Sequence, residues 1–236
     1  MAGAYKGREK YIQDGWGDNA SRSLMSLLRS LFVEGFAMHG VIPSDLADDF
    51  MPQIKEGHFY KIRIFEVVPR LRKTHLVVPL ETELFFNVST QINEVREGVS
   101  KFPDYYFKFA SYDQVMIRNE KCYCLTDVIV VLGQTTDVKP IVLNNNKGSV
   151  DKRDIFLTLI SGKKIRITVC DPKILELDIT GIIRMGYKPV LAIDGLYIKD
   201  NSGNKQINTC STTKFYLDID IHEACDVRKR ISKISF

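Results

Sequence analysis

The sequence predicts an all-β protein of two small barrels in tandem, each with one short helix and the first of them incomplete. Three observations lead to this prediction. Runs of alternating apolar and polar residues recur along the chain, which is typical of half-buried strands. Clusters of glycine, asparagine, aspartate and serine separate these runs and mark turns. One pattern of strand, helix, glycine and strand occurs twice, which indicates an internal repeat.

The two copies of this pattern are separated by a nearly constant number of residues. The first copy comprises, in order, a strand at 36–42, a helical segment at 44–54, Gly57 and a strand at 60–68. The second copy comprises a strand at 164–170, a helical segment at 171–184, Gly186 and a strand at 189–198. A glycine after each helix fits the left-handed backbone that commonly ends a helix. Ser44 and Asp171 are the expected N-caps. Two unrelated strand–helix–strand units are the alternative explanation.

The second copy is surrounded by enough strands to complete a barrel. Further strands are expected at 124–134, at 154–160 and near 210–217. Five strands with one helix between the third and the fourth form an OB barrel. Applied to the first copy, the same spacing gives a second strand at 25–33 but puts the first strand before Met1. We therefore expect the first barrel to lack its first strand.

The expected boundaries follow from this repeat and from composition. They are a disordered leader at 1–23, a partial first barrel at 24–98, an aromatic linker at 99–112, a second barrel at 113–228 and a basic tail at 229–236. The leader is rich in small and polar residues and has no apolar periodicity, which is typical of a disordered segment. The linker holds six aromatic residues between Phe102 and Tyr112. These are expected to pack between the barrels, with a base-stacking platform as the alternative.

Composition excludes several classes of protein. The net charge of +4 is mildly basic, which allows a nucleic-acid partner without requiring one. No apolar run approaches the roughly 18 residues of a membrane span, so no membrane association is expected. The five cysteines fit neither a disulfide framework nor a zinc site and are interpreted as reduced thiols. Phosphate-binding loops and metal-ligand motifs are absent, so we expect no cofactor, no metal, no small-molecule substrate and no enzymatic activity.

Several segments resemble the large, 70 kDa DNA-binding subunit of replication protein A, particularly in its plant forms. In the first half these are the segments at 42–46, 50–62, 67–69, 72–75 and 86–90. In the second half they are 125–129, 161–164, 188–193 and 218–224. Together these segments span about residues 24–228. The OB modules of Helitron-type transposon helicases have similar sequences. The resemblance implies single-stranded DNA binding in replication, repair and recombination, a place in the nucleus, and other replication protein A-type subunits as partners.

Two kinds of side chain are candidates to hold single-stranded DNA, cations for the phosphates and aromatic rings for the bases. Strand faces and the loop between strands four and five are the regions where OB barrels bind oligonucleotides. The candidate cations in these regions are Lys61, Arg63, Arg70, Arg72, Lys73, Lys163, Lys164, Arg166, Lys199 and Lys205. Phe65 and Tyr197 are the candidate aromatic residues. The alternatives are a solvated polar surface for the cations and a place in the core for the aromatic residues.

The resemblance also implies stacking aromatics that this sequence does not have. In the second barrel their positions fall near Cys170 and Asn201. In the first barrel one falls near Ile42, and no aromatic residue lies between Arg70 and Leu84. Because each stacked base contributes about 1–3 kcal/mol, weaker DNA binding is expected.

Two other functions fit the sequence. A barrel without its first strand would have an open sheet edge, and a partner protein could add a strand there. The chain would then be a protein-interaction module with little DNA binding. It could also be a fragment of a Helitron-type helicase or transposase whose chemistry lies in other sequence.

Overall fold

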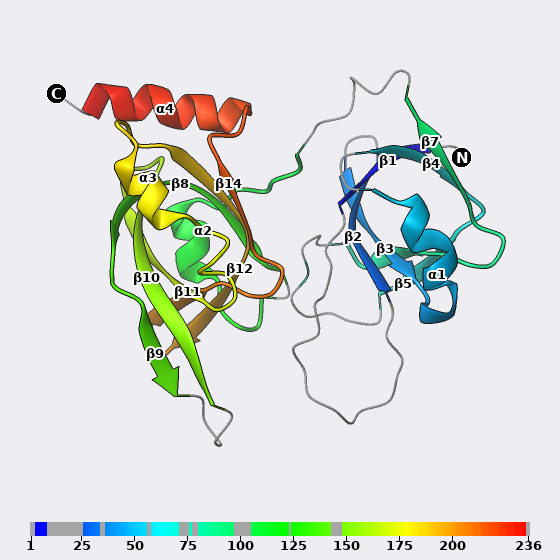
Figure 1. Ribbon diagram of the computed structural model, residues 1–236, viewed down its shortest axis with the longest axis horizontal. Coiled ribbons are helices and arrows are strands. Elements are labelled where there is room, and N and C mark those ends of the chain that lie inside the picture. The colour runs from blue at the N-terminus through cyan, green and yellow to red at the C-terminus, as the bar shows by residue number, and fades with distance from the viewer. Residues whose placement is uncertain are drawn as a thin grey trace. The chain divides into compact units, whose positions relative to one another are not determined.

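The computed structural model divides the chain into two compact units, Met1–Tyr106 and Phe107–Phe236, and both consist mainly of strands (Figure 1). The residues that it describes are all except 1–2, 9–25, 34–35, 56–57, 71–75, 77–79, 97–104, 123, 143–147 and 235–236.

The second unit is a closed OB barrel, as the sequence predicts. Its strands are β8 (Thr126–Thr135), β10 (Ser149–Leu159), β11 (Lys164–Cys170), β12 (Val190–Asn201), β13 (Asn204–Asn208) and β14 (Lys214–Leu217). Antiparallel ladders join β8 to β10, β10 to β11, β12 to β13 and β12 to β8. A parallel pairing of β11 with β13 closes the ring. Strand five of the barrel is therefore β13 continued by β14, which also pairs with β12.

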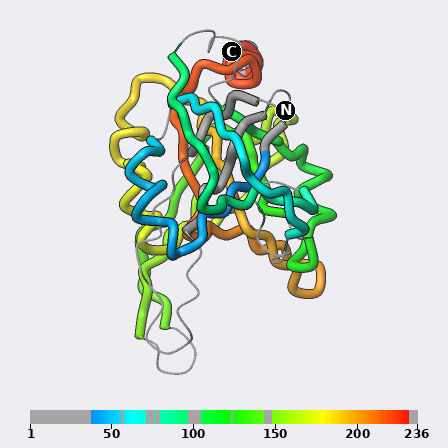
Figure 2. Tube along the Cα trace, turned by 90° about the vertical axis from the view of Figure 1, so that its right-hand side faces the viewer, coloured from blue at the N-terminus to red at the C-terminus, as the bar shows by residue number. Residues whose placement is uncertain are grey.

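The connection between the first two strands of this barrel is a hairpin. β9 (Lys139–Val142) pairs with the first part of β10, and the register joins Lys139 to Lys152. Figures 1 and 2 show this hairpin extending beyond the rest of the barrel. β10 is long enough to serve both the hairpin and the barrel, because its second part pairs with β8 and β11.

Alternation along β10 and β11 separates an inner from an outer face. Ile155, Leu157 and Leu159 are buried, whereas the residues between them are half-buried. The inward side chains of β11 are Ile165, Ile167 and Val169. Each fully buried Leu or Ile side chain stabilises the fold by about 1.5–3 kcal/mol, so this pattern also fixes the register of the two strands.

Helix α3 (Ile179–Arg184) lies between β11 and β12, where the repeat predicts a helix, but it starts later than expected. The segment after the expected cap Asp171 forms turns instead. The side chain of Asp178 caps the helix by accepting a hydrogen bond of 2.8 Å from the Gly181 amide. A further helix, α2 (Tyr112–Ile117), begins with a capping box in which Ser111 and Gln114 bond each other's backbone amides.

Helix α4 (His222–Ile234) runs through most of the segment expected to be a basic tail at 229–236. Ala224 and Val227 of α4 are buried against Ile129, Val131 and Val190 on the outer face of β8 and β12. Apolar burial therefore docks the helix. The sequence does carry a signal for it, because Ala224, Val227, Ile231 and Ile234 recur at helical spacing.

Replacing Asp218 with alanine is expected to destabilise the second unit by about 1–3 kcal/mol. Asp218 accepts hydrogen bonds from the Val190 amide at 2.9 Å and the Tyr187 hydroxyl at 2.8 Å, and its carboxylate lies 3.4 Å from Arg228 of α4. Its φ of 48° also suits aspartate better than alanine. Chemical denaturation measures the loss. Asp218→Asn keeps an acceptor for Val190 and should cost less, whereas equal losses would contradict this account.

The first unit is also a closed barrel, which corrects the prediction of a missing strand. Its strands are β1 (Gly3–Arg8), β2 (Ser26–Val33), β3 (Phe36–Ile42), β4 (Phe59–Arg63), β5 (Glu66–Pro69), β6 (Thr82–Phe85) and β7 (Gln91–Val95). β1 pairs antiparallel with both β2 and β4, as the first strand of an OB barrel does. The segment expected to be a disordered leader therefore contains this strand. Constant spacing failed here because the loop lengths of the two copies differ.

The remaining pairings of the first barrel match those of the second. β2 pairs with β3, β3 runs parallel to β6, and strand four is split into β4 and β5. Between β3 and β4 lie the short helices η1 (Ser44–Leu46), α1 (Ala47–Phe50) and η2 (Met51–Gln53), in the predicted helical segment. The prediction that Ser44 is the N-cap is wrong, because Pro43 occupies the N-cap position. The rings of Phe50 and Phe86 pack edge to face in the core, with their centres 5.3 Å apart.

One turn is repeated in atomic detail in the two barrels. In the first, strand four bends at Ile64, and the Thr90 hydroxyl donates to the Ile64 carbonyl at 2.9 Å. In the second, strand four bends at Gly195, and the Thr213 hydroxyl donates to the Gly195 carbonyl at 2.8 Å. Both threonines also accept from a backbone amide three residues earlier, at 2.9 Å. This shared device supports the internal repeat over two unrelated units.

Candidate nucleic-acid interface

The outer face of β10 and β11 gathers cations around one aromatic side chain. Lys164 and Arg166 are both exposed on β11, two residues apart and therefore on one side of the strand. On β10 the outward positions include Lys152 and Phe156, both half-buried. Lys164 and Arg166 were expected from the sequence but Lys152 and Phe156 were not, although alternation from Ile155 to Leu159 was a signal for the outward position of Phe156.

The register places these residues opposite one another. Phe156 is the direct partner of Arg166 on β11 and of Gln134 on β8. Directly opposite residues have Cβ atoms about 4.5–5.5 Å apart, so their side chains are neighbours. The face is thus a strip across three strands with Phe156 in the middle.

Cys170, where the resemblance implies a stacking aromatic, lies at the end of this face. Its direct partner on β10 is Lys152. Burial raises the pKa of the Cys170 thiol, and the nearby charge of Lys152 opposes this shift. The position thus provides a cation beside a small side chain.

Lys163 is turned away from the other two cations of its segment. Its ammonium lies 3.1 Å from the carboxylate of Asp113 and 4.5 Å from the ring centre of Tyr112, both at the start of α2. Because half of the side chain is exposed, the ion pair contributes little stability and is easily exchanged for another anion.

The loop between strands four and five of the second barrel is a tight turn at Ser202 and Gly203. The prediction that Lys205 binds DNA is not supported by its surroundings. Its ammonium donates to the Asp200 carboxylate at 2.6 Å and to the Arg118 carbonyl at 2.7 Å, so it holds the hairpin in place. The hydrogen bond from Lys205 also keeps the pKa of Asp200 below its usual value.

Lys199 and Tyr197 lie side by side on β12. Lys199 is exposed, and its ammonium lies 5.7 Å from the ring centre of the half-buried Tyr197. A cation over an aromatic ring is stabilised by about 0.5–1 kcal/mol at an exposed site.

In the first barrel the predicted residues divide into three groups. Lys61 and Arg63 lie on one side of β4, opposite the buried Tyr60 and Ile62, which agrees with the predicted spacing. Phe65 packs against the core of this barrel, so the structure favours the core alternative for it. Arg72 and Lys73 lie outside the described residues.

Arg70 is placed differently from the prediction. Only 4% of the residue is exposed, and its guanidinium lies 3.6 Å from the Glu83 carboxylate. It also donates to the Leu80 carbonyl at 3.3 Å and contacts the ring of His39. These contacts tie the two ends of the strand four–five loop to β3, so this cation serves the fold.

Phe107 and Phe109 of the aromatic linker pack on the second barrel. Phe107 stacks on Phe109 at 4.9 Å between ring centres and meets Tyr216 edge to face at 5.3 Å. Phe109 also forms a bridge to Asp127 at the start of β8. Phe102 lies outside the described residues.

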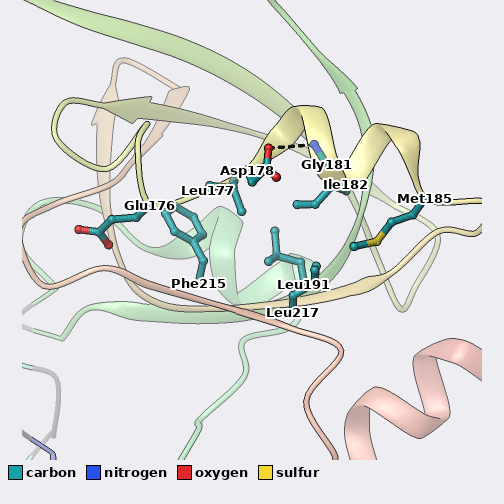
Figure 3. A pocket seen from close by; sticks show the side chains of 9 residues that line it. All are labelled: Glu176, Leu177, Asp178, Gly181, Ile182, Met185, Leu191, Phe215 and Leu217. Carbon is teal, nitrogen blue, oxygen red and sulfur yellow. Dashed lines mark hydrogen bonds between the residues drawn. The ribbon is translucent and has the colours of Figure 1, made fainter.

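A cavity of about 290 Å³ lies between α3 and the strands β12 and β14. Figure 3 shows Leu177, Ile182, Leu191 and Phe215 around it, with the Asp178–Gly181 hydrogen bond at its edge. The described residues contain no group of three or more His, Cys, Asp or Glu side chains that could hold a metal ion. Nor does any helix within the described ranges have the length and apolar character needed to cross a membrane.

The strand order of both units and the cationic strand face define a tandem OB-fold protein. Residues 116–218 match the family described as "Replication protein A OB domain". The chain is 26% identical, over 79% of its length, to a 70 kDa DNA-binding subunit of replication protein A from Arabidopsis thaliana. It is 26% identical, over 77% of its length, to "Replication factor A protein 1" of Schizosaccharomyces pombe. The predicted similarity to the replication protein A large subunit is thereby confirmed.

The chain spans only 21% and 28% of the length of these two relatives. Among solved structures it is similar to a replication protein A heterotrimer bound to single-stranded DNA, with a TM-score of 0.61 and 20% sequence identity. That match covers 99% of this chain and 52% of the other, and it confirms the tandem OB fold.

Proposed function

We propose that this chain binds single-stranded DNA during DNA replication, through the outer face of β10 and β11. The observation that carries the proposal is the placement of Lys152, Lys164 and Arg166 around the outward Phe156. Strands two and three form the face by which OB barrels hold oligonucleotides, and these are the corresponding strands here. The name of the Arabidopsis relative, which calls it a DNA-binding subunit, supports the same function.

A non-enzymatic role, a place in the nucleus and an association with other replication protein A-type subunits belong to the same proposal. They are supported by relatives named as replication proteins and by the heterotrimer among the similar structures. Roles in repair and recombination extend the proposal to other processes that expose single strands.

The alternative of a protein-interaction module loses one of its supports, while the absent stacking aromatics and the mild net charge still favour it. The support lost is the open sheet edge expected from a missing strand, because β1 occupies that position between β2 and β4. The alternative of a Helitron-type fragment stays a prediction.

The proposal is tested by titrating the protein with a labelled oligo-dT of about 30 nucleotides and with a duplex of equal length. Phosphate contacts make the logarithm of the binding constant fall linearly with the logarithm of salt concentration. We expect the single strand to bind more tightly than the duplex and with such a dependence. Equal binding of both, or none at low salt, would overturn the proposal.

Arg166→Ala is expected to weaken oligo-dT binding several-fold and to lower the salt slope by about one, because it removes one phosphate contact. The measurement is the dissociation constant across a salt series. Arg184→Ala is the matched control, since Arg184 is an exposed arginine on α3 rather than on the strand face. A slope unchanged in Arg166→Ala, or changed equally in both variants, would contradict the assignment.

A further inference from the structure

The placement of Phe156 is not accounted for by the core of its barrel. Its neighbours along β10, Ile155 and Leu157, are both fully buried and belong to that core. Phe156 points the other way, and it belongs to none of the three apolar clusters formed by the described residues. Phe156 is half-buried, so part of its apolar surface stays in contact with water, which costs free energy unless a ligand covers it.

The β8 residues next to Phe156 are a glycine and an exposed glutamine. The β8 residue before its partner Gln134 is Gly133, which has no side chain. A Cβ added to Gly133 would lie 3.1 Å from the Phe156 carbonyl oxygen, so the two backbones approach closely at this point. Gln134 itself is exposed. A flat ligand approaching from β8 therefore meets little steric obstruction.

The charges around Phe156 fit a polyanion. Arg166 lies directly across from it, and Lys164 lies two positions further along the ladder. Lys152 shares the outward side of β10 at the opposite end of the face. The carboxylate of Asp154 also faces this side, but it accepts a hydrogen bond of 2.7 Å from the Thr168 hydroxyl. An apolar ring flanked by cations matches a nucleotide, whose base has a flat π-face and whose phosphates are negative.

We propose that Phe156, with Arg166 beside it, is the base-stacking site of the second barrel. Strand two thus supplies the ring that the resemblance would place on strand three, where this chain has Cys170. The inference rests on the proposed binding of single-stranded DNA and assigns the residue that recognises the bases.

The loss of base stacking and the loss of a phosphate contact change the affinity and its salt dependence differently. Phe156→Ala is expected to weaken oligo-dT binding about tenfold, within the range of one lost stack, and to leave the salt slope unchanged. Phe156→Tyr keeps an aromatic ring and should bind within about twofold of the wild type. An abasic oligomer of equal length has phosphates but no bases, so the wild-type preference for oligo-dT over it should shrink in Phe156→Ala.

A fluorescence variant reports on stacking directly. The chain has one tryptophan, Trp16, so the double variant Trp16→Phe, Phe156→Trp carries a single indole at the proposed site. Oligo-dT is expected to quench its emission, whereas the abasic oligomer should not. The matched control carries Trp16→Phe with Tyr187→Trp, because Tyr187 is exposed but lies between α3 and β12.

The outcomes separate this inference from the function on which it rests. The stacking site is supported if the wild type binds oligo-dT, Phe156→Ala binds it about tenfold more weakly, and oligo-dT quenches tryptophan emission only at position 156. Wild-type binding that Phe156→Ala leaves unchanged, or quenching equal at both positions, overturns the stacking site while single-strand binding stands. No binding by the wild type overturns both. Circular dichroism of each variant establishes that the barrel is folded.

Discussion

Thr213→Val is expected to destabilise the second barrel by about 2–4 kcal/mol, because it removes a hydroxyl that hydrogen-bonds two backbone groups at the bend of strand four. The Thr213 residue is fully buried. Its hydroxyl donates to the Gly195 carbonyl at 2.8 Å and accepts from the Cys210 amide at 2.9 Å. Valine has nearly the same shape, so the loss reports the hydrogen bonds and not a cavity. The bend at Gly195 should loosen as a result.

Urea denaturation followed by far-ultraviolet circular dichroism measures this loss. The matched control is Thr180→Val, because Thr180 is exposed on α3 and should change stability little. Thr90→Val makes the corresponding change in the first barrel and should destabilise that unit instead. A Thr213→Val protein as stable as the wild type would show that the repeated turn contributes no stability.

The free energy of unfolding of the second unit is expected to fall as pH rises from about 4 to about 7. Burial, followed by the nearby negative charge of Asp194, raises the pKa of the Asp127 carboxyl to about 7. In the unfolded chain this carboxyl titrates near pH 4. The folded state therefore holds a proton that the unfolded state has released in this window, so its stability is fully present below pH 4 and is lost towards pH 7. The loss is on the order of a few kcal/mol.

This carboxyl joins three parts of the second unit. It accepts hydrogen bonds from the Lys108 amide at 3.0 Å and the Gly195 amide at 3.1 Å, and Asp194 lies beside it in the barrel wall. Asp194→Asn removes the neighbouring charge and should reduce the pH dependence between pH 4 and 7, although burial of Asp127 maintains part of it. Denaturation at half-unit pH steps measures it, with Asp220→Asn as an exposed control. Stability that rises with pH, or an unchanged profile in Asp194→Asn, would contradict this explanation.

The sequence predicted both barrels because their cores follow simple alternation. Ile165, Ile167 and Val169 are spaced two apart and point inward, as expected from the pattern alone. β1 was missed for a physical reason. Its six residues include two glycines and no apolar periodicity, so it is a strand only because β2 and β4 pair with it on both sides. Such pairing between distant segments cannot be predicted from the local sequence.

The candidate site was predicted less completely than the fold. Lys164 and Arg166 were identified because they follow the turn into the predicted strand, and their alternation with the inward Ile165 and Ile167 places both on its outer side. The partners of Arg70 and Lys205 could not be predicted, because the sequence shows a charge but not its partner, here Glu83 and Asp200. Phe156 was missed because stacking aromatics were expected on strand three and in the strand four–five loop.

Binding of single-stranded DNA by the outer face of β10 and β11 is the central claim. Amide chemical shifts of the ¹⁵N-labelled protein, recorded during titration with a short oligo-dT, test it residue by residue. We predict that the largest changes fall on residues 152–158 of β10 and 164–168 of β11, with little change on α4. No changes, or changes concentrated around α4 or the cavity beside α3, would contradict the claim.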